Sequence, residues 1–176
     1  MRNYRYVLGI DPSGNFKEGK GTTGWSVFDR KKEAFIDCGE IRARNYNTQE
    51  DYWLEHTKLI LAVIQKYNHI DVAVSMEDFV LYANRARAQV NSAMETCQLI
   101  GVIKMLCYRQ IDLFMRTASQ VMNRWTDDIL ANKKYIRKEG KAWYTDCYPR
   151  ALSTHIRDSM RHAVHCATFE IGKEKT

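Results

Sequence analysis

The chain has 176 residues, with 27 Lys or Arg against 21 Asp or Glu, so its formal net charge at pH 7 is +6. This length predicts one domain spanning residues 1–176 with a single sizeable core. The positive charge suits a polyanionic partner, although an ordinary basic protein would have the same balance. The N-terminus lacks a long apolar stretch and the other apolar segments are interrupted by charge, so we expect neither a signal peptide nor a transmembrane helix.

The five cysteines are widely spaced and include no C-x-x-C pair. An odd number of separated cysteines favours reduced thiols that pack as small hydrophobic side chains. This pattern predicts a cytoplasmic protein without structural disulfides.

Strands dominate the first part of the chain. Residues 5–11 form an apolar run that ends on Asp11, and residues 24–29 and 34–41 predict two further strands joined by a hairpin at residues 30–32. A polar turn at residues 13–23 separates the first two strands and is rich in glycine. Glycines at this density predict a flexible loop beside Asp11.

Helices and strands alternate in the middle of the chain. Thr48 is a suitable N-cap for a helix that extends to about residue 67. The apolar stripe expected on this helix consists of Tyr52, Trp53, Leu59, Val63 and Ile64. Residues 72–76 predict a fourth strand, residues 86–108 the longest helix and residues 113–115 a fifth strand. The predicted fold class is therefore α/β, with a central mixed five-stranded sheet flanked by helices.

The stretch at residues 132–150 is the most basic and least periodic part of the chain. Two interpretations stay open for it: a solvated surface loop, or an arm whose cations contact phosphates. The cations that would make such contacts are Lys133, Lys134, Arg137 and Lys138.

A predicted helix near the C-terminus has two different faces. At 100° per residue, His155, Asp158, His162 and His165 fall within one arc of about 80°. Apolar residues occupy another arc, so one face could pack on the sheet while the other holds a metal. The surface or packing residues among the histidines are expected to be His56, His69 and His165.

Carboxylates end two of the predicted strands. Asp11 closes the first strand, Glu77 closes the fourth, and Asp158 lies near the start of the last helix. Buried carboxylates are costly unless their charge is offset, and a divalent cation is the common offset where several converge. Asp78 should point to the opposite face of the strand from Glu77 and be solvated or salt-bridged. The pattern therefore predicts a metal site where Asp11, Glu77 or Asp78, and the face of the last helix that carries Asp158 converge.

At these residues the chain resembles the RuvC-like Holliday junction resolvases of the RNase H-like nuclease superfamily. Asp11 in "GIDPS…TTGWSV", Glu77 in "VAVSMEDF", and His155 with Asp158 in "HIRD" match the family pattern. Sugar kinases and actin-like ATPases begin with a similar first motif, but they need two such domains and a longer chain. The resemblance covers nearly the whole chain and implies an RNase H-like fold. The turn at residues 13–23 is longer than in cellular members, which suggests a phage-encoded protein that would act in the host cytosol.

The resemblance implies a structure-selective DNA endonuclease that nicks four-way junctions symmetrically by two-metal hydrolysis of the phosphodiester bond. Asp11, Glu77 and Asp158 would hold two Mg²⁺ ions per site, with Mn²⁺ able to substitute. His155 would be a metal ligand or a proton carrier for the attacking water. Because a histidine stands where other members have an aspartate, it stays open whether His155 or His162 lies closer to the metal.

The resemblance also implies branched DNA as the partner and a homodimer, for which the apolar helix at residues 86–108 is the candidate interface. In the resolvases an aromatic side chain after the catalytic glutamate contacts unpaired bases, and nearby basic residues hold phosphates. The corresponding residues of this chain are Phe79 or Tyr82, with Arg85 and Arg87. Two alternatives stay open: an RNase H-like nuclease acting on flaps, other branched DNA or RNA, and a branched-DNA-binding protein without catalysis.

Overall fold

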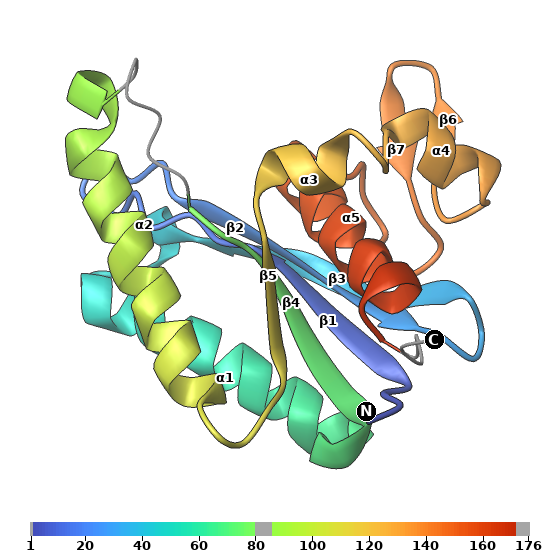
Figure 1. Cartoon of the computed structure of the whole chain (residues 1–176). Helices are drawn as coiled ribbons and strands as arrows, with labels where there is room; N and C mark the ends of the chain where they lie inside the picture. Colours follow the sequence, from blue (N-terminus) through green and yellow to red (C-terminus); the bar gives the residue numbers. More distant parts are fainter. Residues whose placement is uncertain (1, 80–85, 172–176) are drawn as a thin grey trace.

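A five-stranded mixed sheet forms the centre of the molecule (Figure 1). The computed structural model describes residues 2–79 and 86–171, with the backbone alone for residues 86–93. The strand order is β3-β2-β1-β4-β5; β1, β2 and β3 are antiparallel neighbours, whereas β4 and β5 run parallel to β1. The predicted fold class is thus confirmed. The strands are β1 Tyr6–Asp11, β2 Thr22–Asp29, β3 Ala34–Arg42, β4 Val72–Glu77 and β5 Leu113–Arg116.

The central strand β1 is apolar because helices cover both faces of the sheet. Successive side chains of a strand point to opposite faces. Leu8 and Ile10 accordingly belong to one hydrophobic cluster, while Val7 belongs to a second cluster on the other face. All three are at most 1% exposed. A strand buried on both sides has a continuous apolar run, which explains why this strand was the clearest signal in the sequence.

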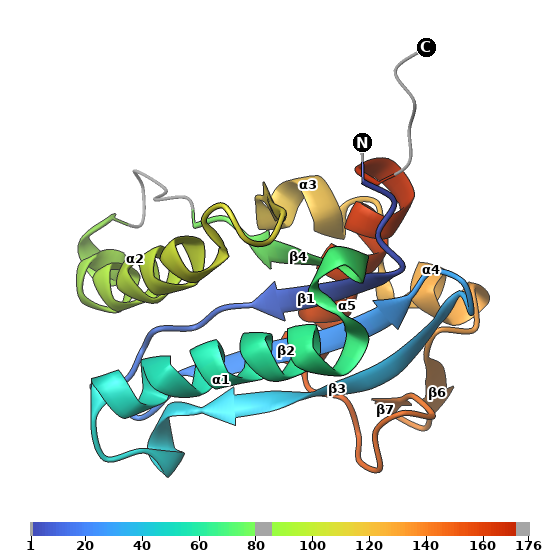
Figure 2. The same cartoon turned by 90° about the horizontal axis from the view of Figure 1, so that it is seen from below.

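Two long helices, α1 (Gln49–Tyr67) and α2 (Ala86–Cys107), pack with the cluster that contains Leu8 and Ile10 (Figure 2). Thr48 caps α1 as predicted, because its side chain accepts a hydrogen bond from the Asp51 N–H at 3.1 Å. No helix among the described residues is both long enough and apolar enough to cross a membrane.

The buried stripe of α1 differs from the predicted one. Leu59 and Ile64 are only half-buried, whereas the fully buried positions of the helix are Tyr52, His56, Ile60 and Val63. The predicted stripe omitted His56, which is buried because its ring has one hydrogen-bond partner in α1, the Tyr52 carbonyl, and one on the sheet, Thr23 Oγ1. Sequence periodicity does not reveal such partners.

The C-terminal helix α5 (Thr154–Phe169) lies against the opposite face of the sheet and touches its backbone. A Cβ atom added to Gly24 would lie 2.0 Å from the carbonyl oxygen of His155, and one added to Gly9 would lie 2.1 Å from that of Ser159. Only glycine allows this approach, so the two glycines fix how closely the first turns of α5 sit on β1 and β2.

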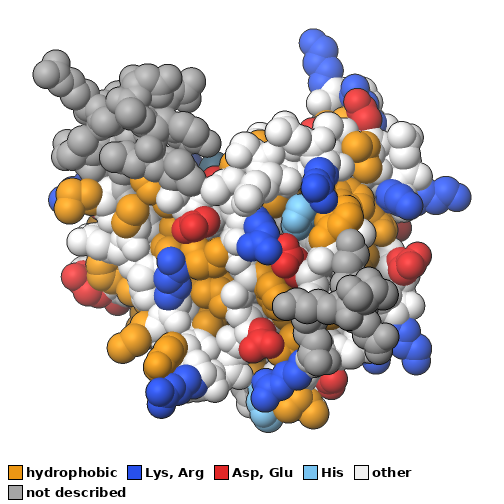
Figure 3. Space-filling view, viewed as in Figure 1, with side chains coloured by type: hydrophobic (Ala, Val, Ile, Leu, Met, Phe, Trp, Pro, Cys, Tyr) orange, Lys and Arg blue, Asp and Glu red, His pale blue; other side chains and the backbone are white. Residues whose placement is uncertain are grey.

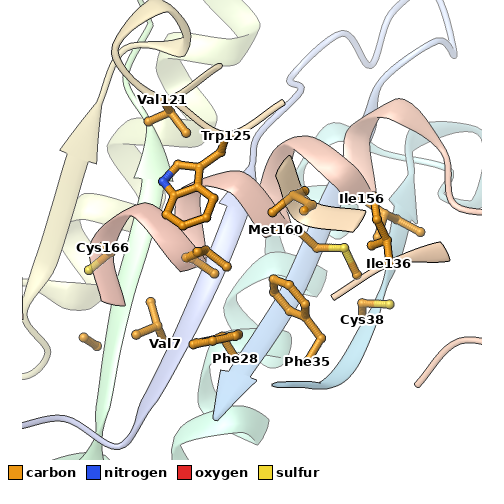
Figure 4. Close-up of a cluster of buried hydrophobic side chains, with 14 of the residues drawn as sticks. Val7, Phe28, Phe35, Cys38, Val121, Trp125, Ile136, Ile156, Met160 and Cys166 are labelled. Atoms are coloured by element: carbon orange, nitrogen blue, oxygen red, sulfur yellow. The ribbon is translucent and has the colours of Figure 1, made fainter. Parts of the chain in front are cut away.

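A segment between β5 and α5 covers the outer side of α5. It contains α3 (Ala118–Met122), α4 (Asp127–Asn132) and a hairpin of β6 (Arg137–Glu139) and β7 (Ala142–Tyr144). Figure 4 shows Trp125 and Ile136 of this segment in the same cluster as Met160 of α5. Part of residues 132–150 is thus a hairpin, and the face of α5 for which a metal was predicted is largely covered, since every residue from Asp158 to Cys166 is buried.

Gly24→Ala should destabilise the protein by about 1–3 kcal/mol, because the new methyl group would collide with helix backbone that cannot move without displacing α5. Urea unfolding measures the change. Gly101→Ala in α2 is the matched control, since nothing lies within 4 Å of its added Cβ atom. If the two variants were equally stable, the contact between α5 and the sheet would be looser than described.

Candidate metal centre

Asp11 and Glu77 end neighbouring parallel strands. The last paired residues of β1 and β4 are Ile10 and Met76, so the next residues, Asp11 and Glu77, emerge together at the carboxyl edge of the sheet. Asp11 is 8% exposed and Glu77 is half-buried. Strand pairing alone therefore brings together two of the predicted site residues.

The helix α5 brings the other two predicted residues to the same edge. Ser153 caps the helix by accepting a hydrogen bond from the Ile156 N–H at 3.2 Å, and the approach at Gly24 holds the first turn against β2. His155 Nδ1 lies 2.8 Å from Asp11 Oδ2. This hydrogen bond is the main reason why the pKa of His155 is raised above its usual value.

The carboxylates perturb one another. Burial, followed by the charge of Asp11 and then that of Asp158, raises the pKa of Glu77 to about 8. Burial and the charge of Asp11 likewise raise the pKa of Asp158 to about 6, although Arg161 acts in the opposite direction. A cation would stabilise the ionised forms of Glu77 and Asp158 beside Asp11.

The donor set suits a hard divalent cation such as Mg²⁺, which prefers carboxylate oxygens. Asp11, Glu77 and Asp158 would hold the metal, with His155 beside them. Among the described residues, however, no group of three His, Cys, Asp or Glu side chains is already arranged as a metal site. The side-chain contacts explain this: Asp11 is hydrogen-bonded to His155, and Asp158 is paired with Arg161.

The two histidines that the sequence left as alternatives occupy different environments. The His155 side chain is 43% exposed at the rim, next to Asp11. His162 is 1% exposed and its Nε2 lies 3.9 Å from Glu77 Oε2, while its Nδ1 has no hydrogen-bond partner among the described residues. Burial lowers the pKa of His162 to about 4, so the ring is neutral behind Glu77. This geometry favours His155 as the residue that meets substrate or solvent.

The other histidines divide between surface and interior, as expected. His69 is exposed, whereas His165 is 6% exposed and packs against the Phe169 ring at 5.0 Å between centroids. Asp78 is half-buried, and its backbone N–H donates to the Arg116 carbonyl.

Sequence reasoning missed a buried polar network below the turn that follows Asp11. His56 Nδ1 donates to the Tyr52 carbonyl at 2.7 Å, and His56 Nε2 lies 2.8 Å from Thr23 Oγ1. Thr23 Oγ1 also accepts from the Ser13 N–H at 3.1 Å, and the Tyr52 hydroxyl donates to the Ser13 carbonyl at 2.6 Å. Both hydrogen-bonding groups of the Ser13 backbone are thus satisfied, which fixes the chain two residues after Asp11.

His56→Gln tests this network through its pH dependence. Burial lowers the pKa of His56 from 6.5 to about 4. The neutral ring therefore contributes stability that is present above pH 6.5 and is lost as the pH falls towards 4. Glutamine takes up no proton, so the advantage of wild type over His56→Gln should shrink by about 2 kcal/mol between about pH 7 and pH 5. Urea unfolding at both pH values measures it, and a constant difference would contradict the buried neutral ring.

The glycine-rich turn beside Asp11, for which the composition predicted a flexible loop, is attached to α2 by hydrogen bonds. Glu95, which is 4% exposed, accepts hydrogen bonds from the N–H groups of Phe16 at 2.6 Å and Lys17 at 3.2 Å. Thr96 Oγ1 accepts from the Gly14 N–H at 3.0 Å. Glu95 lies in the interior of α2, far along the chain from the strands on either side, so the sequence gave no signal of this role.

The nucleic-acid-binding predictions are only partly within the described structure. Tyr82 and Arg85 lie outside the described residues, as does the side chain of Arg87. Phe79 is half-buried and packs against the hydrophobic cluster under α1 and α2. It follows Glu77 by two residues, so its main chain is close to the carboxylates.

The four basic residues of the segment that covers α5 differ in their availability. Lys133 and Lys134 are exposed, and Lys138 Nζ lies over the Trp143 ring at 5.3 Å from its centroid. Arg137 is paired with both Glu139 at 2.8 Å and Asp146 at 2.6 Å. Arg137 is therefore the least available of the four for a phosphate.

Comparisons with known proteins give a similarity in structure and none in sequence. No protein-family model and no curated protein matches the chain. A structure of Thermus thermophilus RuvC in complex with a Holliday junction substrate is similar with a TM-score of 0.64 and 15% identity, over 95% of each chain. A second T. thermophilus RuvC structure has a TM-score of 0.63 and 15% identity, over 94% of this chain and 95% of the other. Together with the mixed sheet and the packing of α5, this similarity shows that the chain has the RuvC-like form of the RNase H-like fold.

Proposed function

We propose that the protein is a divalent-metal-dependent endonuclease that resolves four-way DNA junctions. One observation carries the proposal: Asp11, Glu77, Asp158 and His155 converge at one sheet edge, where the charge of Asp11 helps to raise the pKa of both Glu77 and Asp158. The similar T. thermophilus protein is in complex with a Holliday junction substrate, which supports the choice of substrate. The four motif residues are thus neighbours in space.

The chemistry follows from the roles that these residues can take. Two Mg²⁺ ions, when bound, would activate the attacking water and stabilise the leaving oxyanion. Asp11, Glu77 and Asp158 would hold them through carboxylate oxygens. His155, which is exposed at the rim, would accept the proton of the attacking water, and its hydrogen bond to Asp11 orients the ring for this step.

The DNA would be held by cations distributed around the site. Lys and Arg side chains are scattered over the face viewed in Figure 3 and are interspersed with acidic ones. We assign phosphate contacts to Lys133, Lys134 and Lys138, and base contacts near the crossover to the segment at residues 79–87 that follows Glu77. Such an arrangement gives general affinity through phosphates and selectivity through unstacked bases.

A cleavage assay tests the proposed function. Wild-type protein should cut a labelled four-way junction in Mg²⁺, but not in EDTA, and should place paired nicks in strands of like polarity. Linear duplex, a flap substrate and an RNA/DNA hybrid serve as controls. Equal cleavage of flaps or hybrids would favour the broader RNase H-like nuclease, and junction binding without cleavage would favour a binding protein.

Paired nicks require two active sites, so we propose a two-fold dimer formed through α2. Leu99, Ile100 and Ile103 of this helix face the core and are at most 5% exposed. Met94 and Met105 of α2, and Tyr108 directly after it, are by contrast between 62% and 77% exposed. Hydrophobic side chains are visible at the left of Figure 3, the side on which α2 lies in Figure 1. These large apolar side chains make the outer face of α2 the better candidate interface.

Met105→Glu should weaken the dimer at least about tenfold, because it places a charge in the apolar contact. Sedimentation equilibrium at micromolar concentration measures the dissociation constant. Ile129→Glu, at an exposed apolar position of α4, is the matched control and should have no effect. A monomeric wild type, with and without junction DNA, would contradict the dimer.

A further inference from the structure

We propose that Arg161 is a resident cation of the carboxylate site: it neutralises Asp158 in the metal-free protein and is retained by Asp127 when a divalent cation binds. The inference rests on the proposed metal site. The inference adds Arg161 as a residue that sets the metal affinity, and Asp127 as a carboxylate that holds Arg161 and is not one of the four motif residues.

The contacts of Arg161 provide the first support. Its Nη1 donates to Asp158 Oδ1 and its Nη2 donates to Asp127 Oδ1. The guanidinium is 10% exposed and Asp158 is 8% exposed, whereas Asp127 is 23% exposed. Arg161 Nε has no hydrogen-bond partner among the described residues, so the two Nη groups make the hydrogen bonds. One positive charge is therefore shared between a site carboxylate and a carboxylate outside the site.

The position of Asp127 provides the second support. It is the first residue of α4, where the helix dipole favours an anion, and Thr126 caps this helix by accepting from the Ile129 N–H. Asp127 also pairs with Arg157 Nε at 3.1 Å. A carboxylate held in this way stays in place when Asp158 changes partner, so Arg161 keeps a counter-charge throughout.

The charges of the site decide the direction of the effect. Asp11, Glu77 and Asp158 are buried close together, and an uncompensated buried charge is strongly destabilising. In the metal-free protein the guanidinium supplies this compensation at Asp158. A divalent cation at the same carboxylate would be repelled by the guanidinium, so metal and Arg161 compete for Asp158.

A different role is conceivable on the same contacts, namely a permanent brace that orients Asp158 for the metal. The two roles predict opposite results for the removal of Arg161. If Arg161 competes with the metal, removing it strengthens metal binding, and removing Asp127 weakens binding because Arg161 then belongs to Asp158 alone. If Arg161 is a brace, both changes weaken binding.

Mn²⁺ titration of the full chain without DNA, followed by electron paramagnetic resonance, distinguishes the two. We expect Arg161→Gln to lower the dissociation constant for Mn²⁺ about tenfold and Asp127→Asn to raise it several-fold. Arg157→Gln is the matched control: it removes a positive charge next to Asp127 without touching Asp158, and should change the constant less than about threefold. The melting temperature of Arg161→Gln should fall in EDTA and recover in saturating Mn²⁺.

The outcomes separate this inference from the proposed function. If wild type showed no saturable Mn²⁺ binding that Asp11→Asn abolishes, the metal site itself would be wrong, and the inference with it. If wild type bound Mn²⁺ but Arg161→Gln bound it equally well or less tightly, the resident cation alone would be overturned. Should Arg161→Gln fail to fold, unchanged or tighter binding by Asp127→Asn would still contradict the inference.

Discussion

Asp11→Asn, Glu77→Gln and Asp158→Asn are each expected to reduce Mg²⁺-dependent junction cleavage by about a thousandfold or more. Each change keeps the shape of the side chain and removes one negative charge that would hold the metal. Junction binding should stay within about threefold of wild type, because phosphate contacts elsewhere supply most of the affinity. Single-turnover cleavage and gel-shift titration measure the two effects.

Asp128→Asn is the matched control for these variants. Asp128 is an exposed acid in α4, next to Asp127 and outside the carboxylate cluster. Its loss should leave cleavage unchanged. A variant of Asp11, Glu77 or Asp158 that cleaved at nearly the wild-type rate would remove that residue from the site.

The Glu77 variant should also be more stable than wild type when metal is absent. Because burial and Asp11 raise its pKa from 4.5 to about 8, folded Glu77 keeps a proton that the unfolded chain releases. This proton contributes stability that is fully present below pH 4.5 and is lost as the pH rises through 8. Glutamine stays neutral, so its advantage in EDTA should grow by about 3 kcal/mol between about pH 5 and pH 8.

Urea unfolding in EDTA at the two pH values tests this gain, and saturating Mg²⁺ should remove it by stabilising wild type alone. An advantage that did not change with pH would mean that Glu77 ionises as easily in the folded protein as in the unfolded chain. The expected combination, a more stable but inactive variant, is the behaviour of a residue kept for function rather than for folding.

The second large effect should separate the two candidate histidines. His155→Ala is expected to lower cleavage about a hundredfold with little loss of stability, because it removes a half-exposed proton acceptor. His162→Ala should instead lower the free energy of unfolding by about 2–3 kcal/mol, because it leaves a cavity behind Glu77 at a position that is 1% exposed.

Cleavage rates and urea unfolding of both variants, measured in parallel, decide between the assignments. His69→Ala is a suitable control, since His69 is exposed and is not one of the motif residues. A stable His162→Ala variant that lost more activity than His155→Ala would reverse the roles of the two histidines.

Much of the fold followed from local patterns. The apolar run that ends on Asp11, the β-branched run before Glu77 and the cap at Thr48 are each encoded within a few neighbouring residues, and the structure has all three elements where they were predicted. Parallel pairing of β1 with β4 then brings Asp11 beside Glu77. A strand buried on both faces is a continuous apolar run rather than an alternation of apolar and polar residues. The centre of the sheet was therefore the easiest part to predict.

The sequence by itself located the ends of β1 and β4 and the start of α5, and the motif resemblance then named the four candidate site residues. Only the tertiary structure decided their surroundings: the pairing of Asp158 with Arg161 and Asp127, the interior position of His162, and the network of His56. Helical periodicity predicts which face of a helix is buried when the helix packs on one neighbouring element. The helix α5, however, is covered by the sheet on one side and by the segment that contains α4 on the other. When a helix is covered on both sides, its polar residues are buried and must find partners that are distant in the sequence, and a local pattern carries no information about those partners.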